Sequence, residues 1–543
     1  MVKISKILSV SRHQKLSGNL IISLLISLAI CVIGQVAKAE TSIYVFDPNQ
    51  STVVRSGGIA GLQKTFSIAG QFRLIVDLEA AIASFEKVDA NLTDETGSVY
   101  GQNLDEIFNM TGLAGTIIDD TTIQFEGKTA DGTESNVSLK LTLGSDSAQL
   151  IGSTTPPPNS ADMFFYNLDA DATKKYASGT GDPNNPYLIY TAEQLNAIGA
   201  EPNDWNKHFK LMADIDLSTY LGTEFNIIGV DRNNTFTGIF DGNNHTICNF
   251  TYTTTATTGY IGLFGCISHA DAIVENLTLT DPNVNAAGHS GYVGSLVGYL
   301  GAGTISGCSI DGGSVSGYDI VGGLAGLNFY GEISNCSATD GVRGVDDRIG
   351  GLVGENCHGK ISNCFAAGSV WGVRDRIGGL VGSNSGTISS CYATGNVSGD
   401  SFIGGLVGYN FEHITNVIIN CYATGSVSGG YNTGGLAGGN YNGTISASFW
   451  DIESSGQTQS AGGTGKTTAE MQTAGTFLEE GWDFIGETGN GTEDIWSICE
   501  GTNYPRLVWQ ITAGDFVCPD GVTIEDFSFF MEHWLDDNCD SSN

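Results

Sequence analysis

The chain has 543 residues, including 75 glycines and 10 prolines, and its apolar fraction of 41% is enough to bury a sizeable core. Its 59 Asp and Glu residues outnumber 23 Lys and Arg, which gives a formal net charge of −36. This charge excludes the basic surface that nucleic acids and anionic membranes require. It is typical of a protein that is soluble outside the cell.

The first 39 residues have the pattern of an export signal. Four basic residues between Lys3 and Lys15 precede an apolar stretch, and Ala37-Lys38-Ala39 forms a small-x-small cleavage site. We therefore expect a signal peptide over residues 1–39 and a secreted or cell-surface protein, with an uncleaved membrane anchor as the alternative. No second apolar run is long enough to span a membrane.

Residues 40–155 contain segments in which apolar and polar residues alternate, such as Val137 to Leu143. Alternation with a period of two predicts half-buried strands, so we expect a small β-sandwich or barrel-like domain here. Three prolines at 156–158 and a turn-rich stretch at 179–186 predict a linker over residues 156–186. Thr191 then has the position of an N-cap, which predicts a short helix covering the end of the following domain.

A repeat of about 28 residues dominates the next part of the chain. The pattern Gly-Gly-Leu-(Val/Ala)-Gly recurs every 26 to 30 residues, with its leucines at Leu324, Leu352, Leu380, Leu406 and Leu436. Each unit has short apolar segments that cannot bury themselves, whereas stacked units share one interior. We predict an all-β chain whose body, residues 187–448, is a right-handed parallel β-helix (solenoid) of nine or ten turns. A propeller is the alternative, but its units are longer, about 40–50 residues.

Stacked turns also predict ladders of identical residues. Cysteines recur at positions 308, 336, 364, 391 and 421, and isoleucines at 349, 377 and 403. Parallel side chains that point the same way do not suit the dihedral angle of a disulfide. We therefore expect the cysteines to be buried thiols that fill space as small apolar groups.

These repeats resemble the GLUG-motif family, named for its Gly-Leu-x-Gly core. The resemblance covers roughly residues 180–510, with Phe236 to Ile247 similar to a lead-in coil and residues 449–510 similar to a closing segment. It implies a large exported or surface protein of adhesin-like character. Some members carry peptidase domains, but this chain lacks the His-Glu-x-x-His pattern that such domains need.

The tail, residues 511–543, resembles the dockerin-like C-terminal segments of planctomycete-type secreted proteins and is expected to be short and helical. The resemblance makes Asp515, Asp520 and Asp526 the candidate calcium ligands, yet neither register of the loop supplies every oxygen that calcium needs. A docking or sorting helix, or a small cap closed by a Cys518–Cys539 disulfide, is the competing interpretation.

Two neighbouring turns carry an unusual set of charged residues and one tryptophan. Asp346-Asp347-Arg348 lies above Arg374-Asp375-Arg376 at an offset of 28 residues, and Arg343 aligns with Trp371. The set forms a ladder of exposed Asp–Arg pairs of small energetic value, a binding patch, or a catalytic cluster. The candidate ligand-binding residues are Trp371, Arg343, Arg348, Asp347, Arg374, Asp375 and Arg376.

We expect a non-enzymatic surface scaffold that binds glycan or another exported protein, with no catalytic residues and no cofactor apart from the calcium considered for the tail. A polysaccharide lyase or hydrolase built on a β-helix is the alternative. These two hypotheses differ in whether the Asp and Arg side chains converge in a cleft or form an evenly spaced ladder. A third hypothesis is an assembly subunit that docks through its tail.

Overall fold

The computed structural model describes residues 40–511 with short gaps, and the chain divides into two compact units, Met1–Thr180 and Gly181–Asn543. The predicted signal peptide and residues 512–543 of the predicted tail lie outside the described residues. The gaps are residues 48–49, 58–61, 78–81, 95–98, 100–103, 120, 130–134, 144–146, 156–163, 256–258, 287, 289–290, 412–415 and 488.

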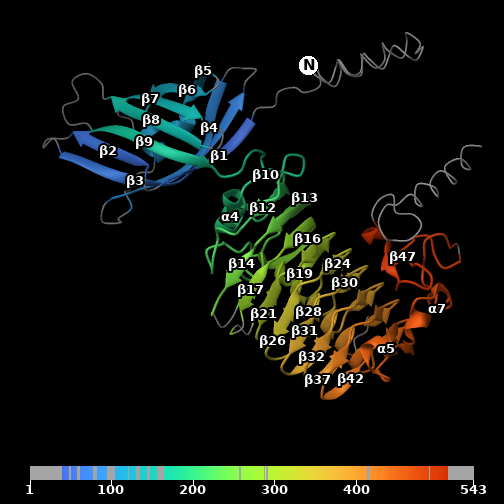
Figure 1. Cartoon of the computed structure of the whole chain (residues 1–543). Coiled ribbons are helices and arrows are strands. Elements are labelled where there is room, and N and C mark those ends of the chain that lie inside the picture. Colours follow the sequence, from blue (N-terminus) through green and yellow to red (C-terminus); the bar gives the residue numbers. More distant parts are fainter. Residues whose placement is uncertain are drawn as a thin grey trace, which may run out of the picture. The chain divides into compact units, whose positions relative to one another are not determined.

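The first unit is built from nine antiparallel strands (Figure 1). They are β1 (Glu40–Phe46), β2 (Thr52–Gly57), β3 (Leu62–Asp77), β4 (Ile82–Thr93), β5 (Ala114–Asp119), β6 (Thr122–Lys128), β7 (Asn136–Leu143), β8 (Ser147–Thr155) and β9 (Phe164–Lys174). Their order is β1-β3-β2-β9-β8-β7-β6-β5-β4, and because β3 also pairs with β4 the sheet closes on itself. The predicted small β domain is confirmed.

Alternation along the strands fills the interior of this closed sheet. In β7, Val137, Leu139 and Leu141 are buried and the residues between them are exposed. The short helix α3 (Leu104–Phe108) and the 3-10 turn η1 (Met110–Gly112) add further buried apolar side chains.

The predicted linker over residues 156–186 requires a correction. Strand β9 pairs with β1, β2 and β8, so the first unit extends well past residue 155. The physical reason is that Leu168 and Ala170 fill the core of the sheet, although their strand follows directly on a proline-rich stretch.

The second unit is a parallel β-solenoid of about eight turns (Figure 1). The predicted fold is confirmed. The solenoid has fewer turns than the nine or ten expected, and in residues 217–238 only the isolated bridges of Ile228 and Phe236 pair with the following turn. Its largest sheet has 23 strands. These are β10 (Tyr187–Ile189), β11 (His208–Leu211), β12 (Ile215–Asp216), β13 (Ile239–Cys248), β16 (Phe264–Thr280), β19 (Val297–Ser306), β20 (Ser309–Asp311), β23 (Ala325–Asn328), β24 (Glu332–Ser334), β25 (Ser337–Ala338), β28 (Val353–Asn356), β29 (Lys360–Ser362), β30 (Phe365–Ala366), β33 (Val381–Asn384), β34 (Thr387–Ser389), β35 (Tyr392–Ala393), β38 (Val407–Asn410), β39 (Val417–Ile419), β40 (Tyr422–Ala423), β43 (Ala437–Asn440), β44 (Thr444–Ser446), β45 (Phe449–Asp451) and β46 (Thr464–Lys466).

Two seven-stranded parallel sheets complete the turns. The tryptophan sheet contains β14 (Thr251–Thr253), β17 (Asn283–Ala286), β21 (Ser314–Gly317), β26 (Gly341–Gly344), β31 (Val370–Gly372), β36 (Val397–Ser398) and β41 (Val427–Ser428). The isoleucine sheet contains β15 (Tyr260–Ile261), β18 (Tyr292–Gly294), β22 (Val321–Gly322), β27 (Ile349–Gly350), β32 (Asp375–Gly378), β37 (Ser401–Gly404) and β42 (Tyr431–Gly434).

The predicted ladders lie in the interior. Ile349, Ile377 and Ile403 are in register across β27, β32 and β37, and the five repeat cysteines are buried free thiols. The backbone N–H of Cys336 donates to the Sγ of Cys364 at 3.4 Å, and the same contact joins neighbouring turns on both sides. The thiol ladder is therefore confirmed.

A second polar ladder was missed by the sequence analysis. Asn328, Asn356, Asn384, Asn410 and Asn440 stack in successive turns, and each Nδ2 donates to the Oδ1 of the next residue at 2.8–3.0 Å. Four of these side chains are fully buried, so their hydrogen bonds replace water. The spacing matches that of the leucines, so the signal was present in the sequence.

Helix α4 (Ala192–Ala200) begins at the predicted position beside the first strands of the solenoid (Figure 1). The Thr191 side chain accepts a hydrogen bond from the backbone N–H of Gln194, and Leu195 and Ile198 are buried. The 3-10 turn η2 (Pro202–Asp204) follows, and the indole of Trp205 donates to the Ile198 carbonyl at 2.7 Å.

The closing segment packs along the side of the last turns. Phe365, Tyr392 and Tyr422 form an outward aromatic stack with ring planes within 5° of parallel. Trp482 and Trp496 cover it, which makes this a second core. The segment contains α5 (Ile452–Ser455), α6 (Thr468–Met471), α7 (Ala474–Leu478), β47 (Trp496–Ser497), β48 (Arg506–Leu507) and the 3-10 turn η3 (Val508–Gln510).

Candidate functional site

The outer face of the tryptophan sheet is set by a three-residue pattern that repeats in five consecutive turns, from β21 to β41. A valine points inward, the next residue points outward, and a glycine follows; Val370, Trp371 and Gly372 are one instance. The outward residues of four successive turns, in register, are Arg343, Trp371, Ser398 and Ser428.

The glycine is required because the backbone packs directly on the isoleucine ladder. A Cβ atom added at Gly399 would lie 2.6 Å from Cδ1 of Ile377 and 2.8 Å from Cδ1 of Ile403. No side chain fits in that space without moving the core. These glycines therefore let the backbone lie close to the isoleucine ladder, next to the outward residues of each turn.

Trp371 stands between an arginine on one side and short side chains on the other. The guanidinium of Arg343 lies 4.2 Å from the centre of the Trp371 ring, a cation–π contact. The predicted alignment of these two residues is thus confirmed. The indole nevertheless remains 39% exposed, which is unusual for a side chain of its size.

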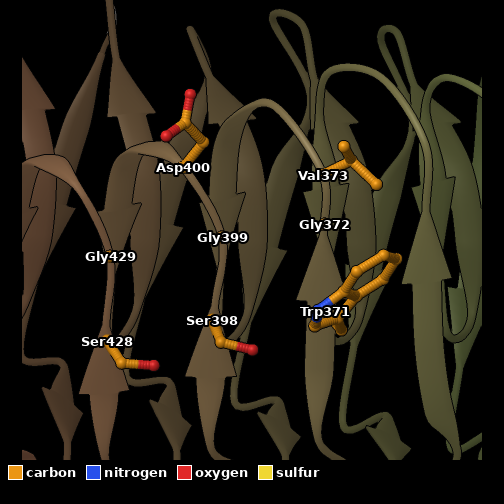
Figure 2. Close-up of a pocket in the computed structure, with 8 residues that line it drawn as sticks. All are labelled: Trp371, Gly372, Val373, Ser398, Gly399, Asp400, Ser428 and Gly429. Atoms are coloured by element: carbon orange, nitrogen blue, oxygen red, sulfur yellow. The ribbon is translucent and has the colours of Figure 1, made fainter.

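A surface pocket of about 390 Å³ begins at Trp371 and extends over the next two turns (Figure 2). This volume is within the usual range of small-ligand sites, ~300–1,000 Å³. Its residues are Trp371, Gly372, Val373, Ser398, Gly399, Asp400, Ser428 and Gly429. Because the pocket follows successive turns, its long direction is the solenoid axis. We call it the Trp371 pocket.

The polar groups of the pocket are held in place but are not used by the fold. The backbone carbonyl of Asp400 accepts hydrogen bonds from the N–H groups of Gly430 and Tyr431, both at 2.9 Å. Within the described residues, the Asp400 carboxylate has no ion pair or side-chain hydrogen bond, and the hydroxyls of Ser398 and Ser428 have no hydrogen-bond partner either. All three groups are at least partly exposed, and Figure 2 shows the Asp400 carboxylate at the far end of the pocket from the indole, pointing away from it.

The charged residues of the prediction are joined by ion pairs between neighbouring turns, and the charges of Asp346, Arg348 and Asp375 also act on the Asp347 carboxyl. Arg374 pairs with Asp346 at 2.8 Å, and Arg376 lies 3.8 Å from Asp347. Asp375 is in β32, in register with Ser401. None of these residues lines the Trp371 pocket.

Arg348 is the most enclosed member of this set. Its guanidinium bridges Asp319 at 2.8 Å and Glu355 at 3.2 Å, and the three side chains are only 20–26% exposed. Burial raises the pKa of the Asp319 and Glu355 carboxyls, and the charge of Arg348 opposes that rise. Arg348 thus joins two turns, while its buried Nε has no hydrogen-bond partner among the described residues.

The calcium candidates Asp515, Asp520 and Asp526 and the Cys518–Cys539 pair lie outside the described residues. Within the described part of the chain, no three His, Cys, Asp or Glu side chains are grouped as metal ligands would be. Cys499, which the sequence analysis did not consider, is disulfide-bonded.

Helices of the described residues are all too short or too polar to cross a membrane.

Comparison with known proteins supports the repeat assignment. The family description "The GLUG motif" matches residues 317–343 and 375–398. A protein of Evansella cellulosilytica named as a Gly-rich membrane protein is 35% identical over 138 residues, which is 25% of this chain and 16% of that protein. A halomucin of Haloquadratum walsbyi is 28% identical over 183 residues, which is 31% of this chain but 2% of the halomucin.

A solved structure also matches this chain, at low similarity. It is a protein of Bacteroides ovatus described as an immunoglobulin A1 protease, with 20% identity and a TM-score of 0.44. The match covers 62% of this chain and 96% of that one. The chain therefore carries GLUG-motif repeats and spans only a small fraction of the two relatives that it matches by sequence.

Proposed function

We propose that this protein is a non-enzymatic β-solenoid scaffold at the cell surface or outside the cell, and that it binds polysaccharide through the Trp371 pocket. The observation that carries the proposal is the exposed indole of Trp371 at the end of a pocket with unpaired hydroxyl and carboxylate groups. Sugar rings pack their apolar faces on aromatic rings, and their hydroxyls need polar partners at the edges.

The location is supported by the export-type N-terminal sequence and by the names of the two relatives, a membrane protein and a halomucin. The high acidic charge of the chain fits the same setting. A repeated rod is also a suitable way of presenting a binding surface at a distance from its point of attachment.

The alternative of a glycoside hydrolase has less support. Such enzymes use a pair of carboxyl groups that flank the scissile bond. Of the eight residues that line the Trp371 pocket, only Asp400 carries a carboxyl group. The Asp346–Arg374 and Asp347–Arg376 pairs both join the same two neighbouring turns, so an arginine already engages each of these carboxylates.

The test is depletion of the purified protein from solution by a panel of insoluble polysaccharides, with released reducing ends measured in the same tubes. We expect binding without product, and Trp371→Ala should weaken it. Tyr441→Ala is the matched control, because Tyr441 is an exposed aromatic residue (59%) that does not line the pocket.

Release of reducing ends by the wild-type protein would refute the non-enzymatic assignment. Absence of depletion by every polysaccharide would refute glycan binding and favour a protein partner. Equal binding by the two variants would place the glycan site elsewhere on the molecule.

A further inference from the structure

The contents of the Trp371 pocket restrict the kind of glycan that it can hold. Its lining includes one carboxylate, Asp400, and no Lys, Arg or His. The guanidinium of Arg343 is stacked against Trp371 from the preceding turn, and Arg343 is not part of the lining. An acidic sugar placed in the pocket would therefore meet the like charge of Asp400, and the guanidinium of Arg343 lies on the other side of the indole.

The position of the free face of the indole also favours a neutral sugar. Arg343 occupies the turn before Trp371, whereas the pocket is lined by residues of the two turns after it. A sugar ring on that side would lie over Ser398 and Gly399, since Ser and Gly leave the space open (Figure 2). Its hydroxyls would then be near Asp400 and Ser428.

A fixed carboxylate is a strong acceptor for hydroxyl donors, and hydrogen bonds to charged groups are stronger than those between neutral groups. Asp400 also has no competing partner among the described side chains. Its backbone is fixed by bonds to the next turn, and its N–H donates to the Arg374 carbonyl at 3.3 Å. The backbone of Asp400 is thus fixed, and its exposed carboxylate is not paired with a cation among the described residues.

Resting on the proposed function, we infer that the pocket selects neutral polysaccharides, with Trp371 as the stacking platform and Asp400 as the acceptor for sugar hydroxyls. Polymers of uronic acids or sulfated sugars are rejected at this site. The charge of the whole chain, −36, acts in the same direction by repelling polyanions before contact. Arg343 serves to hold the indole upright and contributes nothing to anion recognition.

The experiment is affinity electrophoresis of the full chain through gels that contain a neutral polymer or its acidic counterpart. Suitable matched pairs are hydroxyethylcellulose with carboxymethylcellulose, and mannan with polymannuronate. We expect retardation by at least one neutral polymer and by neither acidic one. Trp371→Ala and Asp400→Asn should each weaken the neutral interaction about tenfold, and Tyr441→Ala should leave it unchanged.

Three results would overturn the inference. The first is retardation by the acidic polymers alone, which would leave glycan binding intact but make the pocket an anion site. The second is full binding by Asp400→Asn, which would remove the carboxylate from recognition. The third is equal retardation by a neutral polymer and its acidic counterpart, which would show that the pocket does not reject anions. If no polymer of either kind binds, the proposed function itself fails, so the two failures are distinguishable.

Discussion

Asp340 is a carboxylic acid buried inside the solenoid. Because of this burial, we expect its contribution to the free energy of unfolding to fall as the pH rises. The side chain is 1% exposed, and burial raises its pKa to about 7. Ser295 Oγ donates to its Oδ2 at 3.1 Å, while Oδ1 has no hydrogen-bond partner among the described residues. In the next turns the same position is glycine, at Gly368 and Gly395.

The sign follows from the direction of the shift. An acid whose pKa is higher in the folded state stabilises the fold fully below its ordinary value of 3.8, and this contribution is lost as the pH rises through the folded value. Each pKa unit corresponds to about 1.4 kcal/mol. Between about pH 5 and about pH 8 the ionisation of Asp340 should therefore cost roughly 3 kcal/mol.

The perturbation is Asp340→Asn, which keeps the shape of the side chain and removes the ionisation. The free energy of unfolding of variant and wild type would be compared by urea denaturation at about pH 5 and about pH 8. These values avoid the sequence pI of 4.3, at which a protein without net charge precipitates. The variant should gain roughly 3 kcal/mol on the wild type over this range.

Other carboxyl groups titrate in the same range, but they do so equally in both proteins and cancel in the difference. Asp271→Asn is the control for the loss of one exposed carboxyl group, since the Asp271 side chain is 92% exposed. A difference for Asp340→Asn that does not change with pH would refute the reasoning. It would mean that Asp340 ionises alike in the folded and unfolded chains.

Three further predictions concern the ladders. Asn384→Ala should lower the free energy of unfolding by about 2–4 kcal/mol in urea denaturation, because it leaves buried amides of the neighbouring turns without partners. Arg348→Ala should cost a similar amount, about 2–4 kcal/mol, since Asp319 and Glu355 lose their counter-charge in a half-buried site; a loss below about 0.5 kcal/mol would contradict this. A thiol reagent should modify the partly exposed Cys248 and Cys357 in the native protein, whereas the ladder cysteines should react only after unfolding; fast reaction of all thiols would argue against a buried ladder.

The solenoid was predictable because its packing is repeated at every turn. The leucine, cysteine and isoleucine columns recur at one interval, and parallel pairing places each column in register. The asparagine ladder has the same interval but was passed over, since Asn in a glycine-rich sequence is more commonly a turn residue. Strand β9 was missed for a different reason: its pairing partners are β1, β2 and β8, and such long-range pairing leaves little local signal.

The candidate site was predictable only in part. The offset of 28 residues between Arg343 and Trp371 predicted their contact, and the two are in register. The pocket itself exists because the neighbouring residues Ser398, Gly399 and Gly429 have small side chains or none. Small residues are common throughout this chain, so their sequence does not reveal which of them border an exposed indole until the register is known.

In a solenoid the residues that repeat serve the common interior, so departures from the repeat are where individual turns acquire properties of their own. Asp340 departs from a glycine column, and Trp371 departs from an outward column that is otherwise polar, with Ser316 before the Arg343–Trp371 pair and Ser398 after it. The first departure is buried and affects stability. The second departure, Trp371, is exposed beside a pocket and does not disturb the packing of the interior. An exposed aromatic side chain of this kind is expected in a residue that serves binding.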